Sequence, residues 1–215
     1  MTRAKICGLT READLAAAAR AGADAVGVIT GVPVDTPREV SATLAAELFD
    51  AVPPFVTGVV VTMPETVDEA VERVRATGAS AVQVYPTLDS AGVTALRDRV
   101  DVDVFASVGV DDDVEGYARA ADAVVLDTTD DADAGGTGRT HDWTRSRKLV
   151  RSLDTPVVLA GGLTPENVRE AVETVGPAAV DTASGVERRG GVKDHDAVRA
   201  FVERARQATR TEREA

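Results

Sequence analysis

Residues 156–182 read PVVLAGGLTPENVREAVETVGPAAVDT and contain the repeating unit from which the fold is predicted. Two apolar runs, Pro156–Gly161 and Ala178–Thr182, flank a stretch in which apolar residues recur at i, i+3, i+4 and i+7 from Val168. This spacing predicts an amphipathic helix between two strands. Thr164 followed by Pro165 predicts the N-cap and the first position of that helix. The segment is therefore predicted to form a strand–helix–strand unit.

The same alternation extends over the whole chain of 215 residues. Eight apolar runs predict strands: Ala4–Gly8, Ala25–Ile29, Val56–Val61, Ala81–Tyr85, Val102–Ser107, Ala123–Asp127, Pro156–Gly161 and Ala178–Thr182. Their continuous apolar character is typical of strands that are buried on both faces. We predict an α/β fold, a single-domain (β/α)8 TIM barrel over residues 1–206, followed by a polar C-terminal tail at 207–215. The alternative is a doubly wound open sheet, which requires fewer strands or a second domain.

The charge balance excludes some classes of partner. The chain has 36 acidic and 24 basic residues, and its net charge of −12 would repel nucleic acid and anionic membranes. Only Lys5, Lys148 and Lys193 are lysine, and the other 21 basic residues are arginine. An acidic surface with so little lysine predicts adaptation to concentrated salt, where screening weakens repulsion between carboxylates. An ordinary acidic cytosolic enzyme is the alternative.

The location of the protein is predicted from what the sequence lacks. No apolar run approaches the ~20 residues that span a bilayer, and no signal-peptide pattern follows Met1. We therefore expect a cytoplasmic protein.

Cys7 is the single cysteine, which excludes an intramolecular disulfide and a cysteine-based zinc site. Whether the protein is a monomer or a homodimer stays open.

The ends of the last two predicted strands carry small residues. Gly161 and Gly162 follow one strand, and Ser184 and Gly185 follow the next. Glycines let backbone N–H groups approach an anion closely, and loops after strands 7 and 8 of such barrels commonly bind phosphate. We therefore predict a phosphate site there, although the same glycines could serve only tight turns.

Cys7 and Asp127 are the predicted catalytic pair. Each ends an apolar strand, and active sites of barrels lie at the carboxyl ends of the strands. An Asp at such a position is costly to bury unpaired, and with Cys7 it could act as an acid–base pair across the barrel mouth. The two histidines, His141 and His195, have no metal-ligand spacing and are interpreted as surface residues or caps. The Asp111–Asp113 and Asp130–Asp133 clusters are interpreted as solvated acidic surface and not as cation sites.

A series of motifs resembles the phosphoribosylanthranilate isomerase family, in order and over nearly the whole chain. The matching stretches are Lys5–Thr10 (KICGLT), Thr36–Val40 (TPREV), Leu126–Thr128 (LDT), Gly135–Gly138 (GGTG), Asp142–Trp143, Leu159–Val168 (LAGGLTPENV), Val180–Asp181, Ser184–Glu187 (SGVE) and Gly191–Asp194 (GVKD). These motifs fall at the predicted strand ends, which makes the resemblance specific.

The resemblance implies an Amadori rearrangement of N-(5-phosphoribosyl)anthranilate to 1-(2-carboxyphenylamino)-1-deoxyribulose 5-phosphate, in tryptophan biosynthesis. It implies a phosphorylated small-molecule substrate, no cofactor and no metal. On the matching positions, Asp127 is the general acid that opens the ribose ring and Cys7 is the general base that removes the C2 proton. Arg38 is expected near the anthranilate carboxylate, and Asp181 is expected to hold a substrate hydroxyl.

The sequence departs from the family at a few positions. Tyr85-Pro86 stands where the family usually has His-Gly, His141 replaces a Phe, Ala183 replaces a Ser, and the loop after the second strand is short and lacks the usual aromatic. Related barrel enzymes remain alternatives. Indole-glycerol-phosphate synthase needs a catalytic Lys inside the barrel, and Lys5 is the only lysine near a predicted strand end. The aminoaldose isomerase of histidine synthesis needs an Asp in place of Cys7. A non-catalytic phosphate-ligand binder would not need Cys7 and Asp127 together.

Overall fold

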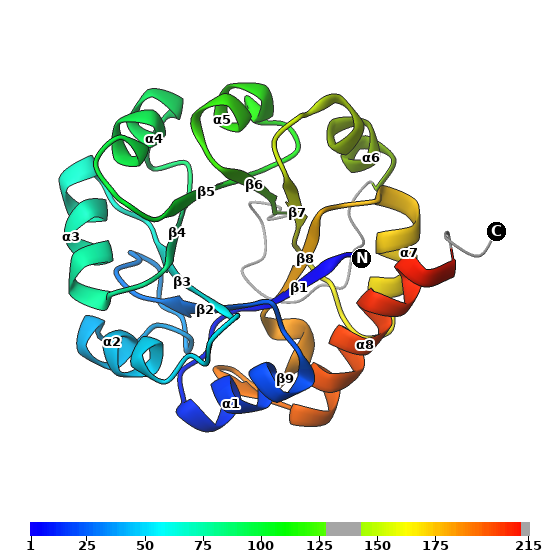
Figure 1. Ribbon diagram of the computed structural model, residues 1–215. Helices are drawn as coiled ribbons and strands as arrows, with labels where there is room; N and C mark the ends of the chain where they lie inside the picture. Colours follow the sequence, from blue (N-terminus) through cyan, green and yellow to red (C-terminus); the bar gives the residue numbers. More distant parts are fainter. Residues whose placement is uncertain (128–142, 212–215) are drawn as a thin grey trace.

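Eight parallel strands close into a barrel, in which β1 pairs with β2 on one side and with β8 on the other (Figure 1). The computed structural model describes residues 1–127 and 143–211. The strands of the barrel are β1 (Arg3–Ile6), β2 (Ala25–Ile29), β3 (Thr57–Thr62), β4 (Ala81–Val84), β5 (Asp103–Val108), β6 (Ala123–Leu126), β7 (Val157–Leu159) and β8 (Ala179–Thr182). All eight predicted strands are confirmed, with ends that differ by no more than two residues. Closure of the ring rules out the open-sheet alternative.

Helices surround the ring of strands on the outside (Figure 1). They are α1 (Glu12–Ala21), α2 (Ala42–Asp50), α3 (Val67–Thr77), α4 (Ser90–Arg97), α5 (Val114–Ala120), α6 (Trp143–Ser152), α7 (Val168–Val175) and α8 (His195–Thr211). Helix α8 continues through Thr211, past the boundary predicted at residue 206. Within the described residues, none of these helices combines the length and the hydropathy needed to cross a membrane.

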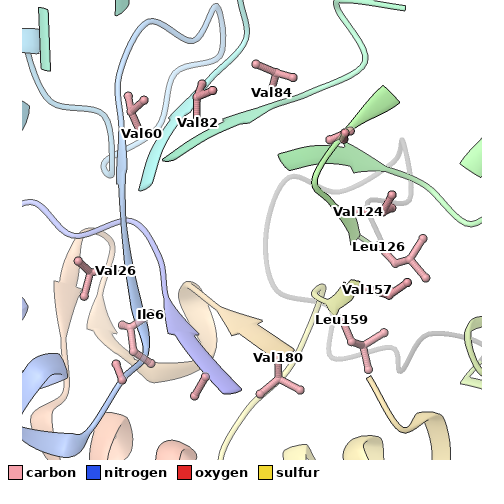
Figure 2. Packing of buried hydrophobic residues seen from close by; sticks show 14 of the residues in the cluster. Ile6, Val26, Val60, Val82, Val84, Val124, Leu126, Val157, Leu159 and Val180 are labelled. Carbon is pink, nitrogen blue, oxygen red and sulfur yellow. The ribbon is translucent and has the colours of Figure 1, made fainter. Parts of the chain in front are cut away.

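Side chains along each strand alternate between two apolar layers. One set packs with the helices in a large cluster, and Figure 2 shows its members around the ring, among them Ile6, Val60 and Leu126. The other set, which includes Val59 and Val125, fills smaller clusters inside the barrel. This alternation follows from the two-residue period of a strand. It explains why the strands are apolar at nearly every position, because both faces are buried.

Helix α7 begins later than the sequence predicts. Its first residue is Val168, and the predicted N-cap Thr164 lies in the turn that precedes the helix. The Thr164 hydroxyl still accepts a hydrogen bond from the Glu166 N–H at 3.2 Å, and the Val168 N–H reaches the Thr164 carbonyl at 3.0 Å. Asn167 explains the delay, because its side chain bonds the Thr164 N–H at 2.8 Å and the Gly162 carbonyl at 3.0 Å. The turn is therefore built to hold the glycine segment after β7.

A short 3₁₀ helix and a hairpin follow β8, and the two strands of the hairpin are not predicted from the sequence. The 3₁₀ helix η1 spans Ser184–Val186, and the hairpin pairs β9 (Glu187–Arg189) with β10 (Val192–Lys193). The sequence GluArgArg of β9 carries no apolar alternation, so periodicity does not reveal it. The glycines of the turn, Gly190 and Gly191, pack against Pro37 so closely that a Cβ on either would overlap that residue. The hairpin therefore docks on the loop after β2.

Candidate active site

Cys7 and Asp127 lie at the carboxyl ends of strands, as predicted. Cys7 directly follows β1, and its N–H donates to the Thr182 carbonyl of β8 at 2.8 Å. Asp127 directly follows β6, and its N–H donates to the Val108 carbonyl at 3.0 Å. Both backbones are thus held by neighbouring strands, which makes their positions rigid.

Tyr85 lies near both predicted catalytic groups. It packs against the small apolar cluster inside the barrel that contains Cys7. Its hydroxyl donates to Asp127 Oδ2 at 3.2 Å. Burial raises the pKa of the Tyr85 phenol, and the nearby Asp127 and Cys7 raise it further, so the hydroxyl stays neutral and acts as a donor. The residue that departs from the family motif therefore bonds Asp127 and packs against the cluster that contains Cys7.

The Cys7 thiol lies in a pocket that depends on a glycine. Only 6% of Cys7 is exposed. A Cβ on Gly27 would lie 2.8 Å from Cys7 Sγ and 3.2 Å from Lys5 Nζ, so the missing side chain makes room for both groups. Burial raises the pKa of the thiol, and the Lys5 and Lys193 ammonium groups act in the opposite direction. These two cations thus limit the cost of forming a buried thiolate.

Lys5 and Asp181 form a buried ion pair beside Cys7. The strands β1 and β8 place the two residues directly opposite each other, and Lys5 Nζ donates to Asp181 Oδ2 at 2.6 Å. Burial alone would lower the pKa of Lys5, but Asp181 and Cys7 outweigh it and raise the pKa above its ordinary value. Within the described part of the chain, Asp181 Oδ1 is buried and has no hydrogen-bond partner. That oxygen can accept a bond from a ligand hydroxyl.

Arg38 is held by an acidic residue on the hairpin. Glu187 accepts from Arg38 Nε at 2.9 Å and from Nη2 at 2.8 Å, which is a two-point contact. Burial raises the pKa of Glu187, but the Arg38 and Lys193 contacts outweigh this and lower it below its ordinary value. The aliphatic part of Arg38 crosses Gly8, where an added Cβ would lie 2.8 Å from Arg38 Cδ. Arg38 therefore lies next to the residue that follows Cys7.

The two glycine segments predicted to bind phosphate lie side by side. Gly161 and Gly162 have φ values of 86° and 63°, a left-handed conformation that favours glycine. Gly185 approaches the Leu163 carbonyl so closely that any side chain there would overlap it, and Thr182 Oγ1 donates to the same carbonyl at 2.7 Å. Ser184 begins η1. The structure thus brings together the segments after β7 and β8.

Asp14 anchors the end of the hairpin to α1. This buried carboxylate accepts a bond from the Lys193 N–H at 3.2 Å and contacts His195 Nε2 at 2.8 Å. Arg11 adds a two-atom contact from the preceding turn. His195 was interpreted as a surface residue or cap; it is the first residue of α8, and its half-exposed ring also binds Asp14.

Of the remaining sequence candidates, the Asp111–Asp113 cluster lies within the described part of the chain and belongs to no metal site there. Within residues 1–127 and 143–211, no group of three or more His, Cys, Asp and Glu side chains could hold a metal. Asp113 caps α5 through the Gly116 N–H at 3.0 Å. The Asp130–Asp133 cluster, the Gly135–Gly138 motif and His141 lie outside the described residues.

Sequence reasoning missed three residues that bond the predicted ones, and a fourth that bonds one of these three. They are Lys5, Tyr85, Glu187 and Lys193. A signal was present for two of them, because lysine is nearly absent from this chain and two of its three lysines lie buried at the site. Glu187 and Lys193 also lie within motifs that resemble the family, although no role was assigned to them.

Comparison with known proteins agrees with this geometry. Residues 4–204 match the family described as N-(5'phosphoribosyl)anthranilate (PRA) isomerase. A curated N-(5'-phosphoribosyl)anthranilate isomerase from the halophilic archaeon Haloarcula marismortui is 58% identical over 209 residues, which cover 97% of this chain and 98% of the relative. This relationship supports the salt-adapted surface predicted from composition.

Solved structures of the same kind match closely. The phosphoribosyl anthranilate isomerase from Thermotoga maritima has a TM-score of 0.84 and 34% identity, over 96% of this chain and 100% of that one. A phosphoribosyl anthranilate isomerase in complex with reduced 1-(o-carboxyphenylamino)-1-deoxyribulose 5-phosphate has a TM-score of 0.80 and 32% identity, with the same coverage. The match over nearly the whole length, the closed barrel and the identity of these relatives together place the chain in the N-(5'-phosphoribosyl)anthranilate isomerase family.

Proposed function

We propose that this protein catalyses the Amadori rearrangement of N-(5'-phosphoribosyl)anthranilate to 1-(o-carboxyphenylamino)-1-deoxyribulose 5-phosphate, a step of tryptophan biosynthesis. The observation that carries the proposal is the placement of Cys7 and Asp127 at the carboxyl ends of β1 and β6, with Tyr85 bonded to Asp127 and packed against the cluster that contains Cys7. Membership in the family supports the choice of substrate.

Asp127 and Cys7 divide the proton transfers between them. Asp127 protonates the ribose ring oxygen, the C1–O bond breaks, and the anilino nitrogen forms an iminium ion with C1. The Cys7 thiolate then removes the proton from C2, which the adjacent cationic iminium has made acidic. The resulting enolamine loses its hydroxyl proton and gains a proton at C1, which yields the aminoketone. The atoms of substrate and product are the same, as an isomerisation requires.

Two neighbours support these roles. The Tyr85 hydroxyl holds one oxygen of Asp127 and so orients the carboxyl group. The Lys5 ammonium favours the thiolate of Cys7 over the thiol, against the effect of burial. A positioned acid and base of this kind typically contribute ~10² to 10⁴ in rate.

The other predicted residues hold the substrate at its two ends. Asp181 Oδ1, which is buried and unpaired in the described structure, would accept a bond from a ribose hydroxyl. Arg38 would bind the anthranilate carboxylate beside Gly8. The Gly161, Gly162, Ser184 and Gly185 segments would bind the phosphate through backbone N–H groups. Binding at both ends would fix C2 near Cys7, which supplies rate through orientation.

The substrate is proposed to be a free small molecule in the cytoplasm. The net charge of −12 disfavours nucleic acid and anionic membranes as partners. We propose that the enzyme works as a monomer or a homodimer.

The two proton-transfer groups provide the main test. Cys7→Ala and Asp127→Asn should each lower kcat by ~10² to 10⁴ while changing KM little, because neither group is assigned to binding. Substrate deuterated at ribose C2 should react more slowly where proton removal limits turnover. Asp98→Asn, which removes an exposed carboxylate at the end of α4, is the control and should leave kcat unchanged. A Cys7→Ala enzyme with near-normal kcat would overturn the mechanism.

A second measurement tests the phosphate site. The dephosphorylated substrate should lose much of its kcat/KM, because the remote phosphate helps to position the ribose. Equal turnover of both forms would show that the two glycine segments serve only as turns.

A further inference from the structure

The hairpin formed by β9 and β10 holds the guanidinium of Arg38 from one side. Glu187 occupies Nε and Nη2, so the Nη1 edge of the group remains for another acceptor. The exposed fraction is 24% for the Arg38 side chain and 4% for that of Glu187. Arg38 therefore remains partly exposed beside Gly8, while the carboxylate that holds it is buried.

An Arg–carboxylate pair has no net charge and offers little attraction to a second carboxylate. Glu187 alone would cancel the positive charge of Arg38. Because the Glu187 contact is nearly dry, that cancellation would be felt strongly at the free edge of the guanidinium.

Lys193 brings a second positive charge to Glu187. Its Nζ lies 2.8 Å from Glu187 Oε1 and donates to the Ala183 carbonyl at 2.9 Å. Its side chain is 0% exposed, so it cannot touch a substrate in the barrel mouth. Arg38 and Lys193 carry two positive charges against the one negative charge of Glu187, which leaves a single net positive charge on the cluster.

The backbone fixes this arrangement. The Lys193 N–H is bound by the buried Asp14 carboxylate at 3.2 Å, and Thr10 Oγ1 donates to the Gly191 carbonyl at 2.7 Å. Gly190 and Gly191 pack closely on Pro37, the residue before Arg38. Lys193 and Arg38 therefore approach Glu187 from two segments that pack against each other, and the hairpin is also bonded to Thr10 and Asp14.

We infer that Lys193 is a specificity-determining residue: by neutralising Glu187 it leaves Arg38 with the net positive charge that selects a carboxylated aryl group on the substrate. The inference rests on the proposed function, in which Arg38 binds the anthranilate carboxylate. Lys193 acts through Glu187 and Arg38 and is thus a positioning residue and not a catalytic one.

The test compares two substrates that differ only in the carboxylate. They are N-(5-phosphoribosyl)anthranilate and N-(5-phosphoribosyl)aniline, and their conversion is followed by proton NMR at one fixed salt concentration. The measured quantity is the ratio of kcat/KM for the two. Removing a unit charge ~7 Å from the carboxylate, at an effective dielectric constant of about 20, should reduce this ratio roughly 50-fold in Lys193→Met. The change should appear in KM and not in kcat, since the reacting atoms are untouched.

Three further variants separate charge from structure. Glu187→Gln/Lys193→Met again has one net positive charge and should recover most of the ratio, and Glu187→Gln alone should equal or exceed the wild-type ratio. Arg188→Met removes a positive charge from the same hairpin, but that side chain is 67% exposed and its ion-pair partner is Asp194. This control should keep the ratio within about twofold, because exposed charges are screened.

Each outcome has a distinct meaning. A folded Lys193→Met enzyme with the wild-type ratio would overturn the inference. If that variant does not fold, a Glu187→Gln/Lys193→Met enzyme that has lost the carboxylate preference would overturn it instead. If the wild-type enzyme converts both substrates equally well, Arg38 does not recognise the carboxylate. If the wild-type enzyme converts neither substrate, the proposed function itself is refuted.

Discussion

Replacing Lys5 by Met removes the ammonium group that lies 2.6 Å from Asp181 inside the barrel, while it preserves most of the volume of the side chain. Asp181 Oδ1 has no partner in the described structure, so the loss of Lys5 would leave both oxygens of a buried carboxylate unpaired. Breaking a buried ion pair by removing one partner costs about 3–5 kcal/mol. We therefore expect Lys5→Met to lower the free energy of unfolding by about that amount, which is a large part of the stability of a typical domain.

Asp181→Asn should be destabilising for the complementary reason, because it leaves the Lys5 charge buried. The double variant Lys5→Met/Asp181→Asn has no buried charge left at this position, so it should cost no more than either single variant. The two changes should therefore be strongly non-additive, as expected for residues in direct contact. Arg97→Met is the control, since the Arg97–Asp122 pair is half-exposed and such pairs contribute about 0–1 kcal/mol.

The assay is urea unfolding followed by circular dichroism, with all variants at the same salt and protein concentration. The reasoning would be refuted if Lys5→Met stayed within about 1 kcal/mol of the wild type, or if the effects of the two single variants simply summed in the double variant. Either result would mean that the Lys5–Asp181 pair is compensated by contacts other than those described.

The other predictions concern pH and salt. Cys7 is the only cysteine, so alkylation by iodoacetamide reports it alone. Because burial raises the pKa of the thiol, the alkylation rate should reach half its maximum at a pH above the ordinary thiol pKa of about 8.5. Lys5→Met should move this midpoint to higher pH, and an unmoved midpoint would contradict the role of Lys5. Burial raises the pKa of Asp14, but hydrogen bonds from His195, Arg11 and the Lys193 N–H outweigh this and lower it. This carboxylate should therefore contribute stability above about pH 3.9, which is lost as the pH falls through its lowered folded-state pKa. Asp14→Asn should make stability less dependent on pH in the acid range, and an unchanged pH dependence would count against this assignment. With a net charge of −12, the protein should melt at a lower temperature in dilute buffer than in molar salt, where the screening length is about 3 Å; a melting temperature that does not depend on salt would argue against salt adaptation.

Local patterns in the sequence were sufficient to predict the strands and their order. A strand that is buried on both faces must be apolar at nearly every position, so each strand can be recognised from its own residues without knowledge of its neighbours. Helix and strand boundaries were less predictable, as α7 illustrates. Thr164 and Pro165 form a good start signal, but Asn167 uses its side chain to hold Gly162, and the helix begins only at Val168.

The short hairpin after β8 had no signal of its own. Its first strand is Glu-Arg-Arg, and it is held in place by close packing of its turn on Pro37, which follows a strand far away in the sequence. Periodicity describes how a segment buries its own side chains, and this segment is positioned by contacts to another part of the chain.

The sequence by itself determined the (β/α)8 alternation and, through its motifs, the positions of Cys7 and Asp127. Only the tertiary structure decided what surrounds them. Lys5 meets Asp181 across 176 positions because closure of the barrel sets β1 beside β8 in a register that places those two residues opposite each other. Arg38 meets Glu187 across 149 positions because the hairpin docks on the loop after β2. Register and docking depend on the sum of many distant contacts, so no local stretch of sequence contains them.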